Sequence, residues 1–530
     1  MKAFTILFFV FLFSFFTFHL CVAQGCLPEG ITFSSQGQIN SFQANYPGCT
    51  IIEGDVTISD NGSGDIANLF GLSVLTSIGG NLKISINNNL YFLTGLDNLA
   101  TIGGDFEIWG NKLQNLTGLE GLTSIGGDLY IHQTTLTSME GLQNLQANTI
   151  MNINITDNPQ LSDCQIQGLC DYLASPNGTV DIGWNGNGCN SVVEVGSACG
   201  GALPCLPYGN YYLLSQDDVD NFATVFPACN QLEGLVRILN SITNLNGLNS
   251  ITSINGGCEI YSTTLSNFEG LNSLSKIAGD FTIHFNPVLV NMIGLESLDS
   301  IGGSFAFRSN DSLEDLEGLN RLKHIGGNLN AGVETYWGSG NPVLTSLSGL
   351  DSLATIGGSL EIYANTMLSD ISGLKYLKPG SIDNLKINYN ANLSSCAVKS
   401  ICDYLKSPDG TAEIHDNAQG CNSREEVEEE CLTDVADQSA AGSRRSAVIV
   451  YPNPFRSSLE FRVSGIEFQK VSLKIYNAQG QEVAVVLNEK LQEGEHTVRW
   501  DAGALPAGVY YFRLSIVDGR WSMGGKIVKY

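Results

Sequence analysis

The chain has 530 residues, in which 53 Asp and Glu outnumber 26 Lys and Arg, so its formal net charge at pH 7 is −27. The excess lies in residues 24–432, which hold 43 acidic and 13 basic side chains. Such a surface repels phosphate, which excludes nucleic acid and anionic headgroups as partners, and it attracts cations or a basic protein.

The first 23 residues have the pattern of a secretory signal peptide. Lys2 precedes a Phe-rich apolar run that ends at Leu20, and Cys21-Val22-Ala23 offers small residues for cleavage before Gln24. A lipoprotein modified at Cys21 is the alternative, although Leu20 is large for the position before a lipidated cysteine. No other segment has 18 continuous apolar residues, so we expect no transmembrane segment.

A unit of 23 or 24 residues recurs along most of the chain. It consists of Gly-Leu, two residues, Leu, then Ile-Gly-Gly, a short alternating strand and an Asn-rich turn, as in GLDSLATIGGSLEIYAN from Gly349. The Gly-Leu pairs fall at Gly71, Gly95, Gly118 and Gly141, and again at Gly247, Gly270, Gly294, Gly318, Gly349 and Gly373. A fixed period of this length predicts a solenoid in which each unit buries its apolar edge against the next.

The strand of each unit alternates between apolar and polar residues. In Leu82-Lys83-Ile84-Ser85, Leu82 and Ile84 are expected to face the core and the other two residues the solvent. Stacked copies then form parallel sheets with strands about 4.8 Å apart. No unit has room for a full amphipathic helix, so the pattern indicates an all-β fold, a parallel β-helix rather than a helix-containing horseshoe.

Cysteines mark the ends of two such domains, residues 24–199 and 200–432. Cys26 and Cys49 open the first domain, which ends with Cys164, Cys170, Cys189 and Cys199; Cys205 and Cys229 open the second, which ends with Cys396, Cys402, Cys421 and Cys431. Matched sets behind a secretory signal predict disulfides, whereas zinc, the alternative, lacks the CxxC pairs that it favours. We expect Cys26–Cys49, Cys164–Cys189, Cys170–Cys199, Cys205–Cys229, Cys396–Cys421 and Cys402–Cys431, and the other pairings remain open.

Two further features lie within these domains. The segment SDCQIQGLCDYLASP predicts a short helix that begins at Ser162 or Asp163. Cys258 takes the place of an inward Leu, so it is interpreted as a buried thiol that packs as a small apolar residue, with a reactive or intermolecular thiol as the alternative.

The composition changes after the second domain. Residues 433–447 turn to Ala, Ser, Gly and Arg, which is typical of a linker. Residues 448–530 hold alternating strands separated by Gly and Asn turns, which predict a small antiparallel β-sandwich.

Two motifs of the repeats resemble a known family. The pattern Cys-x4-Gly-x-Val-x-Ile occurs at Cys49 and again at Cys229, and LxxIGGxLxI recurs after each. With them, residues 26–431 resemble two copies of the receptor L domain, the right-handed β-helix in the extracellular parts of insulin- and epidermal-growth-factor-type receptors. The chain has no cysteine-rich module between the two copies and no kinase, so receptor signalling is not implied.

The tail carries a second resemblance. It contains, in order, YPNPF from Tyr451, IYN from Ile475, WD from Trp500, LPAGVYY from Leu505 and GKIVK from Gly525. With these motifs, residues 448–530 resemble the type A C-terminal sorting domain of the type IX secretion system of Bacteroidetes. The resemblance implies export across the outer membrane by that machinery, removal of the tail, and attachment to anionic lipopolysaccharide or release.

No catalytic constellation is found. The motifs GxSxG, HExxH and the P-loop do not occur, and the five histidines after the signal are scattered. A glycosidase-type pair of carboxylates is weighed as an alternative, but spaced acids mean little in so acidic a chain. Residues 59–65 resemble part of a calcium loop without its ligand spacing, so we interpret them as a turn. The sequence therefore predicts a protein that is not an enzyme, with no catalytic residue, cofactor or metal.

The outward strand positions offer the candidate ligand-binding residues, because aligned strands bring aromatic and charged side chains into one exposed ladder. The candidates are Trp109, His132, Tyr261, His284, Arg308 and Tyr363, joined by Tyr336 and Trp337 in an insertion between Gly318 and Gly349. Ordinary cross-strand packing, and an inert loop, are the alternatives.

We therefore expect a secreted or cell-surface-anchored binding or adhesion protein that recognises an extracellular protein or glycan through solenoid faces. Its other partner is the type IX secretion machinery, reached through residues 448–530. The alternatives are a structural coat protein without a discrete ligand and, more weakly, an enzyme that acts on polysaccharide.

Overall fold

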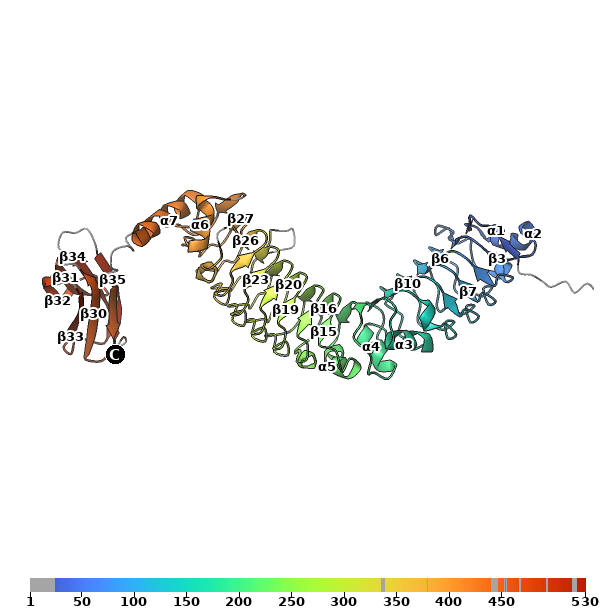
Figure 1. Ribbon diagram of the computed structural model, residues 1–530, viewed down its shortest axis with the longest axis horizontal. Coiled ribbons are helices and arrows are strands. Elements are labelled where there is room, and N and C mark those ends of the chain that lie inside the picture. The colour runs from blue at the N-terminus through green and yellow to red at the C-terminus, as the bar shows by residue number, and fades with distance from the viewer. Residues whose placement is uncertain are drawn as a thin grey trace, which may run out of the picture. The chain divides into compact units, whose positions relative to one another are not determined.

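The computed structural model describes residues 24–530 except 335–338, 379, 409, 440–446, 452, 454, 467–468, 492–493 and 517–521. The expected signal peptide, and Tyr336 and Trp337, lie outside the described residues. The chain consists mostly of β-strands with few helices, and it divides into two compact units, Met1–Glu428 and Glu429–Tyr530 (Figure 1).

The first repeat region holds two parallel sheets. The shorter sheet contains β1 (Gln24–Cys26), β3 (Cys49–Ile52), β5 (Ser77–Ile78), β7 (Thr101–Ile102) and β9 (Ser124–Ile125). The longer sheet contains β2 (Ile31–Phe33), β4 (Val56–Ile58), β6 (Leu82–Ser85), β8 (Phe106–Trp109), β10 (Leu129–His132), β11 (Ile153–Thr156), β12 (Thr179–Gly183) and β13 (Tyr208–Gly209). Because β13 pairs with β12, part of the segment assigned from sequence to the second domain completes the first sheet.

The second repeat region has the same plan. Its longer sheet contains β14 (Tyr211–Leu213), β16 (Val236–Leu239), β18 (Cys258–Tyr261), β20 (Phe281–His284), β22 (Phe305–Arg308), β24 (Leu329–Ala331), β26 (Leu360–Tyr363), β27 (Leu385–Asn388) and β28 (Ala412–His415). Its shorter sheet contains β15 (Gln231–Leu232), β17 (Ser253–Ile254), β19 (Lys276–Ile277), β21 (Ser300–Ile301), β23 (His324–Ile325) and β25 (Thr355–Ile356).

Strands of adjacent repeats pair in register, so equivalent residues stack in columns. Phe106, Leu129 and Ile153 are neighbours in one column and are fully buried, as the alternation predicts. The glycine of the Gly-Leu pair makes close stacking possible at the corner. Gly95 has φ +115°, and a Cβ there would overlap the carbonyl of Leu69 in the preceding repeat.

A ladder of buried asparagines closes the opposite corner, just after the strands of the longer sheets. Asn310 donates its side-chain amide to the Ile283 carbonyl (3.1 Å) and to the Asn341 side chain (3.1 Å), and its oxygen accepts from the Asn286 backbone N–H (3.2 Å). The asparagine ladder comprises Thr263, Asn286, Asn310, Asn341, Asn365, Asn390 and Asn417, with shorter versions at Asn87–Asn111 and Thr134–Asn158–Asn185. It provides hydrogen bonds to buried backbone groups at the ends of the strands and in the turns that follow them.

Short helices cover the ends of the regions. They are α1 (Gln36–Asn40), α2 (Phe42–Asn45), α3 (Gln167–Ala174), α4 (Val192–Ala198), α5 (Gln216–Val225), α6 (Lys399–Lys406) and α7 (Arg424–Ser439), with 3-10 turns η1 (Phe70–Leu72), η2 (Ala147–Thr149), η3 (Asn246–Leu248) and η4 (Ser372–Leu374). Helix α7 extends into the segment expected to be a linker. Helix α3 begins at Gln167, and the expectation of a start at Ser162 or Asp163 is wrong, because Asp163 instead forms a bridge with Ser138.

Disulfides tie these ends together. The bonds are Cys26–Cys49, Cys164–Cys189, Cys170–Cys199, Cys205–Cys229 and Cys396–Cys421. Cys402 and Cys431 are also disulfide-bonded. Cys258 is a free thiol that is 2% exposed, and burial raises its pKa to about 12, which fits the interpretation of a packed apolar residue.

The two repeat regions meet in a packed junction. Helix α4 packs on α5, where the Ser191 hydroxyl donates to the buried carboxylate of Asp218. The ring of Tyr212 lies over Gly183 and against Trp184, with 4.3 Å between the ring centroids. A side chain larger than hydrogen at Gly183 would occupy the place of the Tyr212 ring, so this glycine allows the second region to stack on the first.

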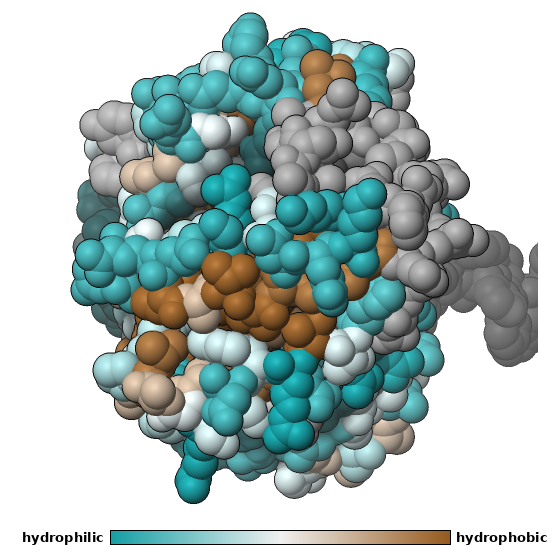
Figure 2. Space-filling view, turned by 90° about the vertical axis from the view of Figure 1, so that its left-hand side faces the viewer, coloured by the Kyte–Doolittle hydropathy of each residue, from teal (hydrophilic) through white to brown (hydrophobic). Residues whose placement is uncertain are grey.

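The C-terminal unit consists of two antiparallel sheets that share one hydrophobic core. One sheet contains β29 (Ala447–Tyr451), β30 (Ser458–Ile466) and β33 (Gly494–Asp501); the other contains β32 (Glu482–Leu491), β31 (Gln469–Asn477), β34 (Gly508–Ile516) and β35 (Ser522–Lys529). Figure 2 shows a face of this unit on which apolar side chains form a patch bordered by polar ones.

Candidate binding surface

The candidate residues lie on the outward face of the two longer sheets. In most four-residue strands, the first and third positions are buried and the second and fourth are half-buried, and we call these half-buried positions the strand ladder. In three strands the fourth position is buried instead. Ser85, which was expected to face the solvent, is 3% exposed, Leu239 is 7% and Asn388 is 1% exposed, and these residues are not part of the surface.

Four side chains form a connected group on β6, β8 and β10, which we call the first tetrad: Lys83, Glu107, Trp109 and His132. Lys83 Nζ lies 2.9 Å from the Glu107 carboxylate, which also lies 3.9 Å from His132 Nε2. The imidazole stacks on the indole of Trp109 at 7°, with centroids 6.1 Å apart, and Lys83 Nζ lies 5.5 Å from the indole centroid. Because β6 and β10 flank β8, the indole is held from both sides.

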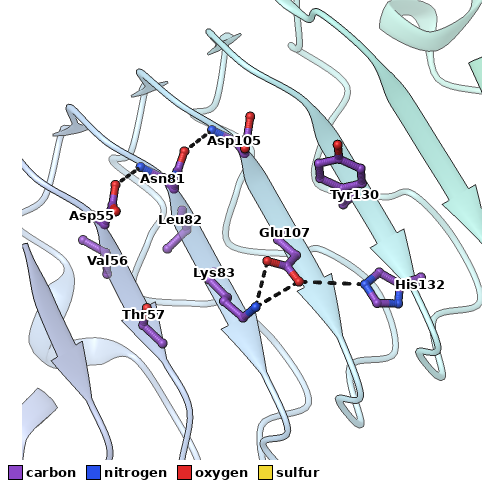
Figure 3. Close-up of a pocket in the computed structure, with 10 residues that line it drawn as sticks. All are labelled: Asp55, Val56, Thr57, Asn81, Leu82, Lys83, Asp105, Glu107, Tyr130 and His132. Carbon is purple, nitrogen blue, oxygen red and sulfur yellow. Dashed lines mark hydrogen bonds and ion pairs between the residues drawn. The ribbon is translucent and has the colours of Figure 1, made fainter. Parts of the chain in front are cut away.

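The first tetrad borders a shallow hollow of about 440 Å³ (Figure 3). Along its edge, the side chains at the strand starts accept hydrogen bonds from the next strand, as Asp55 does from the Asn81 N–H (2.7 Å) and Asn81 from the Asp105 N–H (2.7 Å). Tyr130 also lines the hollow, and its hydroxyl donates to Asp128 (2.7 Å), a bond that raises the pKa of Tyr130 to about 12.

The same arrangement recurs in the second region on β16, β18 and β20, as the second tetrad: Arg237, Glu259, Tyr261 and His284. Arg237 Nε lies 2.7 Å from Glu259, whose carboxylate lies 4.0 Å from His284 Nε2. Tyr261 and His284 stack at 6°, with centroids 5.0 Å apart. The basic residue, the glutamate, the aromatic ring and the histidine occupy equivalent strand positions in the two tetrads.

The second tetrad differs from the first in that a second arginine, Arg308, lies close enough to influence its histidine. Arg237 lies over the rings of Trp184 (5.3 Å) and Tyr212 (6.0 Å), which come from the junction between the regions. Burial, followed by the nearby Arg308 charge, lowers the pKa of His284, and Glu259 opposes this shift. The neutral imidazole is therefore the favoured form at this position.

The remaining candidates extend the ladder toward the C-terminal end. Arg308 lies over the Phe285 ring at 5.2 Å. Tyr363 contacts Tyr389 (5.3 Å between centroids) and Lys386 (5.7 Å to the ring), and Lys386 also pairs with Glu334 at the base of the insertion. That ion pair raises the pKa of Lys386 and anchors the start of the insertion against β27.

Sequence reasoning found the aromatic and histidine members of the tetrads and did not select the residues that connect them. Lys83 and Glu107, with Arg237 and Glu259, were visible as second-position residues on neighbouring strands. Each glutamate is the second residue of its strand, and it lies near the histidine that is the fourth residue of the next strand.

Within the part of the chain that the structure describes, no helix is long and apolar enough to cross a bilayer. The same described residues contain no cluster of three or more His, Cys, Asp or Glu side chains suited to a metal ion.

Residues of the tail motifs form hydrogen bonds that join the two ends of the C-terminal unit. The Asn453 side chain donates to the Lys526 carbonyl (2.9 Å) and accepts from the Val528 N–H (2.9 Å), which fixes the start of the tail to β35. The Lys529 ammonium is buried and donates to the Ala502 carbonyl (2.6 Å).

Comparison with known proteins identifies this tail. Residues 449–529 match the family model of the secretion system C-terminal sorting domain. No curated protein matches the chain. The tail indicates export through the type IX secretion system and implies that it interacts with that machinery. The protein is therefore a secreted protein of the bacterial cell surface.

Proposed function

We propose that this exported protein is a non-enzymatic binding or adhesion protein that recognises an extracellular protein or glycan through the strand ladder. The observation that carries the proposal is the tetrad, which occurs once in each repeat region with the same residue types, register and stacking. Paired charges beside a partly exposed aromatic ring and imidazole provide hydrogen bonds and apolar contact for a ligand.

The tetrads also favour binding over catalysis. Each glutamate is shared between a basic side chain and a histidine, so its charge is already balanced within the group. Two equivalent sites on one chain allow a repetitive ligand to be held at both, which strengthens binding without any new contact.

We further propose that residues 24–199 and 200–432 are right-handed parallel β-helices of the receptor L domain kind. The in-register parallel pairing, the repeat length and the disulfides at both ends of each region support this. The pairing of β13 with β12 makes the boundary between the two a shared strand layer.

The proposal is tested with residues 24–530, the chain without the expected signal peptide, on arrays of glycans and of extracellular matrix proteins, with calcium and with chelator. We expect a reproducible ligand whose binding falls at least tenfold in Glu107→Gln and in Glu259→Gln and is lost in the double variant. Glu317→Gln, at an exposed position outside the ladder, is the matched control.

Binding that is equal in all of these variants would refute a role for the tetrads. A folded, disulfide-complete protein that binds nothing on either array would instead favour a structural coat protein. Release of reducing sugar from an arrayed polysaccharide would favour an enzyme.

A further inference from the structure

A second hollow lies outside the strand ladder, in the segments that lead from β4 to β5, from β6 to β7 and from β8 to β9. Its volume is about 480 Å³. It is lined by Ala67, Asn68, Phe70, Tyr91, Phe92, Thr94 and Gln114, and we call it the aromatic hollow. Its three aromatic side chains are unusually exposed for their size: Phe70 is 61%, Tyr91 45% and Phe92 43% exposed.

Phe92 breaks a rule that the other repeats follow. Three residues before the Gly of each Gly-Leu pair, nine repeats carry Asn, Asp or Ser, whose side chain accepts a hydrogen bond from the backbone N–H two residues further on. These residues are Asn68, Asn115, Ser138, Asn244, Asn267, Asn291, Asp315, Ser346 and Asp370. Phe92 gives up this bond and exposes a ring in its place, so folding does not explain it.

The other two aromatics are also exceptional in their columns. The position of Tyr91 is Ala67 in the repeat before and Gln114 in the repeat after, and the position of Phe70 is Thr94 one repeat later. Three such exceptions in two adjacent repeats meet in one hollow. This convergence indicates a site selected for contact with something outside the chain.

The chemistry of the aromatic hollow is neutral. None of its seven lining residues is charged, although the chain has a net charge of −27. Among the described residues, the structure gives no protein partner for the Tyr91 hydroxyl, the Thr94 hydroxyl or the Gln114 side-chain amide, nor an acceptor for the Thr94 backbone N–H. Exposed rings next to unpaired neutral donors and acceptors fit a molecule with apolar C–H faces and many hydroxyls.

From these observations we propose that the aromatic hollow binds an uncharged glycan, whose sugar rings stack on Phe70, Tyr91 and Phe92. Seven lining residues are far fewer than the 20–30 per side of a stable protein–protein interface, which favours an oligosaccharide over a protein partner. The absence of a lining charge disfavours an acidic polysaccharide. This site is distinct from the tetrads and does not depend on them.

The test is calorimetric titration of residues 24–530 with neutral hexasaccharides of glucose, mannose, galactose and xylose, with oligogalacturonate as the anionic probe. We expect at least one neutral hexasaccharide to bind. Phe92→Asn, which restores the residue of the other repeats, is expected to weaken that binding at least tenfold while raising the midpoint of thermal unfolding. Phe70→Thr is expected to weaken it similarly, and Tyr376→Ser, at a 63% exposed tyrosine outside the hollow, leaves it unchanged.

Several outcomes would overturn the proposal. They are the absence of binding by every neutral hexasaccharide, a preference for oligogalacturonate, or an affinity that Phe92→Asn and Phe70→Thr leave unchanged. Glycan binding that is lost in Glu107→Gln and retained in Phe92→Asn belongs to the ladder and also refutes the hollow. A dimer in light scattering that Phe92→Asn converts to a monomer would show that the aromatics serve self-association instead.

Discussion

Replacing Asn310 by alanine removes a central member of the asparagine ladder in the second repeat region. The side chain is fully buried and makes four hydrogen bonds: to the Ile283 carbonyl, to the Asn341 side chain, and from both the backbone and the side chain of Asn286. The variant leaves the buried Asn286 N–H without this acceptor and removes three further hydrogen bonds, including one to the Ile283 carbonyl on β20. At about 1–3 kcal/mol for the unsatisfied N–H and about 1 kcal/mol for each of the other bonds, we expect a loss of about 4 kcal/mol.

Amide hydrogen exchange of peptides that cover β20 and β22 measures this loss locally, as a fall in the free energy of opening. Asn267→Ala is the matched control, because its side chain accepts a single hydrogen bond from the Glu269 N–H (3.1 Å) at a half-buried position, for an expected loss of about 1 kcal/mol. Equal protection in the two variants would refute the view that the ladder stabilises the stack.

Three further changes test other parts of the structure. Gly183→Val should displace the Tyr212 ring, cost about 1–3 kcal/mol and separate the unfolding of the two repeat regions in calorimetry; a single unchanged transition would contradict the junction. Since the pKa of His284 is lowered by burial, the unfolded chain binds the proton first. The free energy of unfolding should therefore fall as pH drops below about 6.5, and urea titrations of His284→Gln should show a smaller fall. The buried Cys258 thiol, with its pKa raised to about 12, should resist alkylation at pH 8 until the chain unfolds, which mass spectrometry detects.

The repeats made much of the backbone predictable. Their period and the alternation of Leu82-Lys83-Ile84-Ser85 predict parallel, in-register strands, because equivalent apolar residues must stack to be buried. The tail motifs predict an antiparallel unit, and the two sheets around one core agree with them. In both cases the residues that alternate along a strand are the same residues that pack in the core, so the strands could be predicted from the local sequence.

Predictions that depend on a single side chain were less successful. Ser162 and Asp163 are good helix-capping residues, yet the chain there stays extended toward the Cys164–Cys189 bond, and α3 starts later. Ser85 was expected to be outward and is buried, because its neighbour in the column is the bulky Trp109. Tertiary contacts decided these positions, and no short sequence window contains them.

The aromatic hollow was within reach of sequence reasoning and was not found. Alternation marks the outward positions of the strands, but it gives no signal in the turns. In the turns the signal comes from equivalent positions of the repeats, where Phe92 among Asn, Asp and Ser is a clear exception. In a repeat protein, departures from the common unit carry more information about function than the unit itself.

The placement of the disulfides also has a consequence for how such a chain changes its length. All five disulfides with assigned pairs lie at the ends of the regions, and each joins cysteines 23–29 residues apart. None of these five bonds joins the repeats between them, so a gene that gains or loses one whole unit keeps both ends intact. Each added unit lengthens the stack by about 4.8 Å. The first region has four Gly-Leu units and the second has six, so the two regions are shorter and longer versions of the same repeat architecture. This fits a surface protein whose length can evolve one repeat at a time.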